Sequence, residues 1–426
     1  RGWTRAGRRY IDPRIHNRVD YSYDWWARSP GEAIPAEGFP AKTDRSILKD
    51  KIPCVSMHFG GYRETREKKD LNKRTPEWLR YEKEWQRLPQ RLVTNPGWNE
   101  QTIDTKAFSW GEWHIWTVDR LFRTTGVRGL YYDDWLPGAS TNELAGSGYL
   151  GEGGVRRATR DIRNQREFHR RIYALVKRYR PEDGIIYLHV SGCPILPILS
   201  FADIDYDGEV MVWSDRIPPE GRYFDTYRMD IFQMLFSCRQ FGVVPGFHDV
   251  TTKTLDYGGS GKILTANNQR QLWSLLLLHD IHLQSAFTSG LEELRMMWLD
   301  LFGIAEDDVK FHGYWDPENG AKLLEFGFQP DPTDIDRASK GYLATYLRPG
   351  KALLIVVRDA PNNYAGEAQA TIRLDRKKLG FAPDAKLAAY DMETMGRNRI
   401  GTIDGNLLKV NVDCDNFRAV LITEEK

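Results

Sequence analysis

Hydrophobic and polar positions repeat in a regular order between about residues 50 and 305. Segments with helical spacing, such as 165–180 with Phe168, Ile172 and Val176 on one face, alternate with short runs of β-branched and aromatic residues. These runs predict strands at residues 19–26, 52–59, 106–110, 127–134, 184–191, 202–209, 242–248 and 280–286. Alternation of strands and helices is typical of parallel strands joined by right-handed crossovers.

Eight strands in this order predict an α/β fold, a (β/α)8 TIM barrel, over residues 1–305. Residues 1–50 could instead be a remnant of an upstream domain. After residue 305 the pattern changes to short strands separated by turn residues, with no long helical segment between them. The expected strands are 342–346, 352–358, 368–374, 386–390, 407–412 and 418–423. They predict a C-terminal antiparallel β-sandwich over residues 306–426.

Charge and composition narrow the class of protein. The 426 residues include 60 Lys and Arg against 59 Asp and Glu, a balance that argues against a dedicated nucleic-acid binder. The best candidate for a membrane span, residues 272–278, is far too short for one. Aromatic residues make up 12% of the chain, and aromatic rings stack well on the C–H faces of sugars. We therefore expect a carbohydrate partner, no nucleic acid and no membrane span.

Chemically active residues gather where the expected barrel strands end. In a barrel of this type the working residues lie at the carboxyl ends of the strands. The expected ends supply Trp110, Asp133, Asp134, Trp135, His189, Asp207, Glu209 and His248, with Trp213 and Arg216 just beyond the sixth strand. We interpret Trp110, Trp135, His189, Asp207, Trp213, Arg216 and His248 as candidate substrate contacts.

The acids favour glycoside hydrolysis, in which one carboxyl group protonates the leaving oxygen and a second attacks the anomeric carbon or activates water. Side chains alternate along a strand, so Asp133 and Asp134 cannot both face one point. We take Asp133 as the nucleophile, with Asp134 as the alternative, and Glu209 as the acid/base. Asp207 would share the strand face of Glu209 and tune its pKa by like-charge repulsion.

A long connection, residues 136–160, follows the acid pair. It is rich in glycine and ends in Arg156, Arg157 and Arg160. It matches no phosphate-binding motif. We expect it either to shape the substrate site, with the arginines contacting an anionic sugar, or to be an ordinary solvated loop.

These residues resemble known proteins. The runs GVRGLYYDDW, YLGEGGVRRATRDIRNQREFHRRIY, LHVSG and SFADIDYDGE resemble uncharacterised bacterial glycoside hydrolase domain proteins. The layout resembles the α-galactosidase (melibiase) and α-amylase-like superfamily of retaining glycosidases. That resemblance implies a nucleophile after the fourth strand, Asp133, and an acid/base after the sixth, Glu209. Galactosidases carry a Lys two residues before the nucleophile, where Tyr131 stands here, so the resemblance does not imply galactose specificity.

Two other functions stay open. Some β-N-acetylhexosaminidases use adjacent acids after strand four with the substrate acetamido group as nucleophile, a role that the Asp133-Asp134 pair could fill. The second open function is that of a barrel that binds carbohydrate without cleaving it. A metal hydrolase is disfavoured because the chain has neither H-x-H nor H-E-x-x-H. The sequence requires no cofactor, and no motif supports a structural Ca²⁺. A polysaccharide-degrading enzyme would be secreted or periplasmic.

Overall fold

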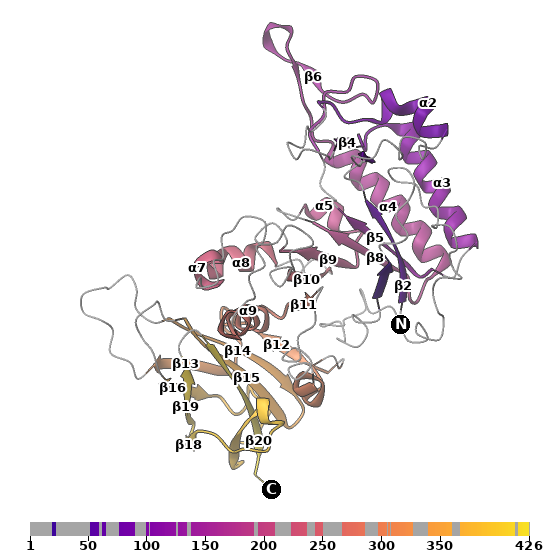
Figure 1. Ribbon diagram of the computed structural model, residues 1–426. Coiled ribbons are helices and arrows are strands. Elements are labelled where there is room, and N and C mark those ends of the chain that lie inside the picture. The colour runs from indigo at the N-terminus through magenta and orange to yellow at the C-terminus, as the bar shows by residue number, and fades with distance from the viewer. Residues whose placement is uncertain are drawn as a thin grey trace. The chain divides into compact units, whose positions relative to one another are not determined.

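The structure is a computed structural model. It describes residues 19–22, 52–58, 62–64, 76–89, 99–101, 103–124, 127–133, 138–190, 195–208, 223–236, 243–249, 266–285, 297–304, 306, 308–326, 340–359, 367–413 and 416–425 (Figure 1). The chain divides into two compact units. The first consists mainly of residues 14–207, and the second mainly of residues 246–426.

Parallel strands form the main sheet, in the order β1-β2-β5-β8-β9-β10-β11. Their bounds are β1 Val19–Ser22, β2 Ile52–His58, β5 Gly129–Asp133, β8 Ile185–His189, β9 Ile204–Asp207, β10 Val244–Asp249 and β11 His282–Ser285. The register is parallel between β1 and β2, β2 and β5, β5 and β8, β8 and β9, and β10 and β11. Seven of the predicted strand positions therefore carry a parallel strand.

The strand expected at 106–110 is wrong, because helix α3 (Phe108–Thr124) begins there. In this helix Trp110, His114, Val118, Leu121 and Phe122 are buried, which is a helical and not an alternating spacing. β2 pairs directly with β5, so no strand lies between them.

Helices α3 and α4 (Ile162–Tyr179) cover one side of the sheet. Their apolar residues, including Val118, Phe168 and Ile172, form one core with Tyr132 and Leu188 of the strands. All five residues of β8 are buried, as expected for a parallel strand that is covered on both faces. Asp161 caps α4 by accepting a hydrogen bond from the backbone N–H of Asn164.

Shorter elements complete the first unit. They are β3 Tyr62–Glu64, α2 Pro76–Trp85, β4 Asn99–Gln101, β6 Tyr149–Leu150, η3 Glu152–Gly154, β7 Arg156–Arg157 and α5 Leu196–Leu199. β3 pairs with β4, and β6 pairs with β7, both antiparallel. Figure 1 shows β6 in a hairpin that projects at the same end of the first unit as α2.

Two antiparallel sheets form the C-terminal part, as predicted. One has the order β12-β14-β15-β20-β17 and the other β13-β16-β19-β18. The bounds of the strands are β12 Lys310–His312, β13 Ala321–Phe326, β14 Lys340–Arg348, β15 Lys351–Asp359, β16 Glu367–Leu374, β17 Leu387–Asp391, β18 Thr402–Asp404, β19 Leu407–Asp413 and β20 Asn416–Glu424. A short 3-10 helix, η7 Met392–Thr394, follows β17. All six expected strands are present, and β12, β13 and β18 are additional.

The five-stranded sheet of this part is buried on both faces. On β15, Leu354 and Val356 face the second sheet, whereas Leu353, Ile355 and Val357 join a separate core. That second core contains helix α9 (Ala266–His279), α7 (Tyr223–Thr226) and α8 (Met229–Leu235). Arg270 of α9 strengthens the contact by donating two 2.7 Å hydrogen bonds to the Glu393 carboxylate.

Candidate active site

The carboxyl ends of β2, β5 and β8 lie side by side in the first unit. His58 ends β2 and pairs in register with Asp133, which ends β5. β8, which ends at His189, is the other neighbour of β5. The structure therefore brings the backbone of the predicted nucleophile next to the strand of His189, at the edge of the sheet where barrel enzymes place their catalytic groups.

A buried hydrogen bond joins these two strands just below their ends. The Tyr131 hydroxyl lies 3.0 Å from His189 Nδ1, and both side chains are buried. The Tyr131 ring also packs against the ring of Tyr187, with centroids 5.4 Å apart. The bond fixes the orientation of the His189 imidazole, and its partner Tyr131 lies two residues before Asp133 on β5. Tyr131 and Tyr187 were not among the predicted site residues, although the alternation Tyr131, Asp133 and Tyr187, His189 was a signal for them.

The opposite side of the same strands carries a second polar cluster, under the helices. The Tyr132 hydroxyl lies 3.1 Å from His114 Nε2, and His169 packs edge-on against the Tyr132 ring. Burial lowers the pKa of His169 well below its usual value, with a further contribution from His114, and burial raises the pKa of the Tyr132 hydroxyl. These buried groups belong to the core beneath α3 and α4.

Asp207 lies on this helix-facing side. The Asp203 carboxylate, just before β9, accepts a 2.8 Å hydrogen bond from the Ile186 N–H. It also forms a 3.1 Å ion pair with Lys177 of α4. Asp205 pairs in register with Leu188, whose side chain is in the core under the helices. Alternation then places Asp207 with Asp205, away from the side of Tyr187 and His189.

By this alternation Asp207 and His189 lie on opposite sides of the sheet, and the role of Asp207 as a substrate contact stays a prediction. Gly208, the residue after β9, has a φ of +126°, a backbone conformation that favours glycine.

The remaining predicted residues fall into three groups. Trp110 is on helix α3 with no exposed surface and stacks on His114, so it lines the core. His248 lies in strand β10, and only its backbone position is described. Asp134, Trp135, Glu209, Trp213 and Arg216 lie outside the described residues.

Within the described part of the chain, no group of three His, Cys, Asp or Glu side chains could hold a metal ion. No described helix is long and apolar enough to cross a membrane.

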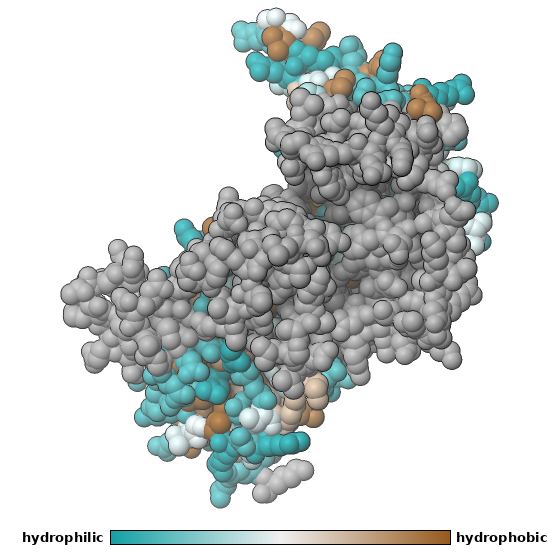
Figure 2. Space-filling view, viewed as in Figure 1, coloured by the Kyte–Doolittle hydropathy of each residue, from teal (hydrophilic) through white to brown (hydrophobic). Residues whose placement is uncertain are grey.

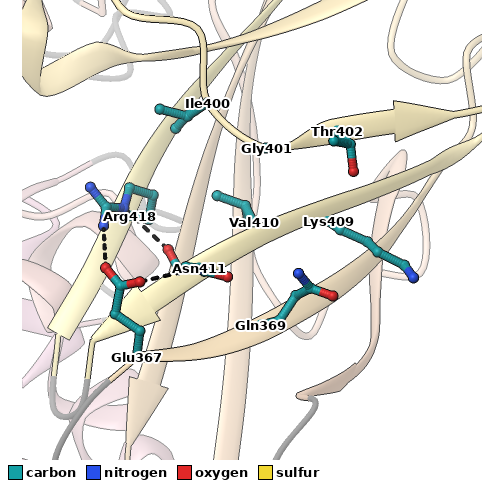
Figure 3. A pocket seen from close by; sticks show the side chains of 9 residues that line it. All are labelled: Glu367, Gln369, Ile400, Gly401, Thr402, Lys409, Val410, Asn411 and Arg418. Atoms are coloured by element: carbon teal, nitrogen blue, oxygen red, sulfur yellow. Dashed lines mark hydrogen bonds and ion pairs between the residues drawn. The ribbon is translucent and has the colours of Figure 1, made fainter.

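A pocket of about 390 Å³ lies on the C-terminal part (Figure 3). Its floor and walls come from β16, β19, residues 400–402 and Arg418. Arg418 and Asn411 both approach the Glu367 carboxylate, at 3.7 Å and 2.9 Å. None of its nine lining residues is aromatic, and none is a predicted site residue. The pocket therefore lacks the flat apolar surface on which sugar rings stack.

Comparison with known proteins supports the fold. No family model and no curated protein matches the chain. A glucanotransferase from Paenibacillus sp., solved with cycloisomaltoheptaose, is similar at 8% identity over 94% of this chain and 80% of that one, with a TM-score of 0.55. An α-amylase from Anoxybacillus gives 9% identity, 94% and 83% coverage and a TM-score of 0.51. A maltogenic α-amylase from Thermotoga neapolitana is similar at 10% identity over 92% of this chain and 83% of that one, with a TM-score of 0.50.

These similarities confirm the predicted fold class: a TIM barrel followed by C-terminal antiparallel β-sheets. The resemblance to these solved structures extends to the fold alone. At these identities the fold does not by itself define a reaction.

Proposed function

We propose that this protein is a glycoside hydrolase whose active site lies at the carboxyl ends of β5 and β8. The observation that carries the proposal is the buried Tyr131–His189 hydrogen bond, which holds an oriented imidazole beside the strand that ends in Asp133. Barrel enzymes place their catalytic residues at the carboxyl ends of the strands, and substrate pockets carry a few polar groups that fix the orientation of the ligand. The glycosidase-like fold supports the same reaction class.

In the proposed mechanism Asp133 attacks the anomeric carbon while the Glu209 carboxylic acid protonates the departing glycosidic oxygen. Water then cleaves the glycosyl-enzyme bond, and Glu209, now a carboxylate, takes its proton. His189 would contact a sugar hydroxyl, and Trp135, Trp213, Arg216 and His248 keep their proposed roles as substrate contacts. Since the substrate would be a polysaccharide, we also propose that the enzyme acts outside the cell or in the periplasm.

Hydrolysis of a panel of aryl α- and β-glycosides by wild type, Asp133→Asn, Asp134→Asn and Glu209→Gln tests the proposal. Because solved neighbours are named as α-amylases and a glucanotransferase, α-glucosides head the panel. We expect turnover to fall by at least about a thousandfold in Asp133→Asn. NMR should show that the first product keeps the anomeric configuration of the substrate.

Other outcomes separate the alternatives. Activity restricted to acetamido sugars, lost in both Asp133→Asn and Asp134→Asn but kept in Glu209→Gln, would favour the substrate-assisted mechanism. Glycan binding without turnover, unchanged in all three variants, would make the protein a carbohydrate-binding barrel.

A further inference from the structure

The β6–β7 hairpin, residues 148–157, belongs to the connection that follows β5, and its base is firmly held. Asn142 donates a 2.6 Å hydrogen bond to the carbonyl oxygen of Gln86. Ser140 and Thr159 pair across the base through two backbone hydrogen bonds. Arg156 donates to the carbonyl oxygens of Thr141 and Ser147, at 2.9 Å and 2.7 Å. The hairpin is thus a fixed projection on the first unit.

The tip of this hairpin exposes apolar side chains next to charged ones. Leu150 is 70% exposed, Tyr149 56% and Val155 54%. Figure 2 shows brown apolar surface among teal polar surface where Figure 1 places β6. Exposed aromatic and aliphatic side chains on a fixed projection indicate a contact surface.

The strand register divides the hairpin into two faces. Tyr149 pairs with Arg157, and Leu150 pairs with Arg156, so each pair shares a face. The Arg156 guanidinium is already hydrogen-bonded to carbonyl oxygens at the base of the hairpin. Arg157 is exposed and makes no ion pair with any described residue. Tyr149 and Arg157 therefore offer a phenol ring and a free guanidinium side by side.

The glycines of the hairpin make room for this pair. A Cβ on Gly151 would lie 3.0 Å from Arg157 Cγ, and a Cβ on Gly148, where φ is +79°, would lie 2.9 Å from the Arg157 carbonyl oxygen. Both positions favour glycine because the Arg157 chain passes close by.

We propose that Tyr149 and Arg157 bind an acidic sugar unit, a uronate or a sulfated sugar, of the polysaccharide substrate. The inference rests on the proposed function for its sugar chemistry. A phenol ring stacks on a pyranose face, and a guanidinium pairs with a carboxylate or sulfate through two parallel hydrogen bonds. Residues 152–166, from the hairpin tip into the first turns of α4, carry five arginines against one glutamate and one aspartate, so the local net charge is positive. The connection leaves the carboxyl end of β5, the edge of the proposed active site.

Binding of the full-length protein to three purified polymers tests the proposal: polygalacturonate, a sulfated galactan and neutral dextran, measured by isothermal titration at fixed salt. We expect wild type to bind one of the acidic polymers and not dextran, and the preferred acidic polymer identifies carboxylate or sulfate. Arg157→Ala and Tyr149→Ala should each weaken that binding about tenfold. Arg178→Ala removes the same charge from the last turn of α4 and should change affinity less than twofold.

Three results would overturn the proposal: binding of neither acidic polymer, equal weakening by Arg178→Ala, or equally tight, Arg157-dependent binding of a single-stranded oligonucleotide. A shift to a dimer in sedimentation that Tyr149→Ala abolishes would assign the surface to a second copy instead. Small aryl glycosides separate this inference from the proposed function. Arg157→Ala should hydrolyse them like wild type, whereas Asp133→Asn should lose hydrolysis and still bind the acidic polymer.

Discussion

His279, the last residue of α9, makes the stability of the second unit depend on pH. Its imidazole is buried, lies over the ring of Trp315 and packs edge-on against Tyr314 and obliquely against Phe232. Nδ1 donates a 2.7 Å hydrogen bond to the carbonyl oxygen of Leu275. Burial lowers the pKa of His279 from 6.5 to about 4, against the smaller opposing effect of that hydrogen bond.

The sign follows from this depressed pKa. The folded protein keeps His279 neutral, whereas the unfolded chain takes up a proton below pH 6.5, so stability falls as the pH falls from 6.5 towards 4. At about 1.36 kcal/mol per pKa unit, the whole shift corresponds to about 3.4 kcal/mol. About 2 kcal/mol of this is lost between pH 7.5 and pH 5.

Urea unfolding of wild type and His279→Gln at pH 7.5 and pH 5, followed by tryptophan fluorescence, measures this contribution. Between the two pH values wild type should lose about 2 kcal/mol more free energy of unfolding than His279→Gln. Phe302→Leu, a buried substitution in the same core, should show the wild-type pH dependence at a lower overall stability. If His279→Gln loses as much as wild type, or if NMR titration of the His279 ring gives a pKa near 6.5, the burial argument is refuted.

Three further substitutions test other contacts. Asp203→Ala should lower the free energy of unfolding by about 3–5 kcal/mol in urea titrations, because it leaves the half-buried Lys177 ammonium without its carboxylate. Tyr131→Phe should lower kcat about tenfold on whichever glycoside is hydrolysed, since the His189 ring loses its fixing hydrogen bond. Arg270→Lys should lower the midpoint of thermal unfolding by a few degrees, because an ammonium cannot make the two parallel hydrogen bonds to the carboxylate.

The Asp203→Ala prediction has a matched comparison. Glu167→Ala breaks the exposed ion pair with Arg170 on the same helix as Lys177 and should change stability by no more than about 1 kcal/mol. An equal effect of Glu167→Ala and Asp203→Ala would contradict the role given to burial. Unchanged kcat in Tyr131→Phe would remove the main support for the proposed site.

The sequence predicts most of the architecture because hydrophobic spacing is local. The helical spacing of Phe168, Ile172 and Val176 and the apolar run of β15 are visible without any structure. The strand predicted at 106–110 is wrong because a five-residue stretch with Phe108 and Trp110 two positions apart fits either a strand or the first turn of a helix. Only the following buried positions, His114 to Phe122, show the helical period.

The candidate site was harder to predict than the fold. Strand ends can be found from the sequence, and His189 lies where it was expected. The side of the sheet that Asp207 faces depends on the register of β9 against β8, which no local pattern contains. The Tyr131–His189 contact likewise joins residues 58 positions apart. Alternation suggested that Tyr131 and Asp133 share a side, but the partner of Tyr131 required the strand pairing.

The two-sided burial of β15 bears on how the chain can be cut. Leu353, Ile355 and Val357 are covered by the core that contains α9, which ends at His279, well before the antiparallel strands begin at Lys310. A fragment that starts near residue 306 would leave this face of the sheet open to water and prone to aggregation. The smallest autonomously folding C-terminal fragment should therefore begin upstream of Ala266, so the position at which β-strands replace helices in the sequence is a poor place to truncate the protein.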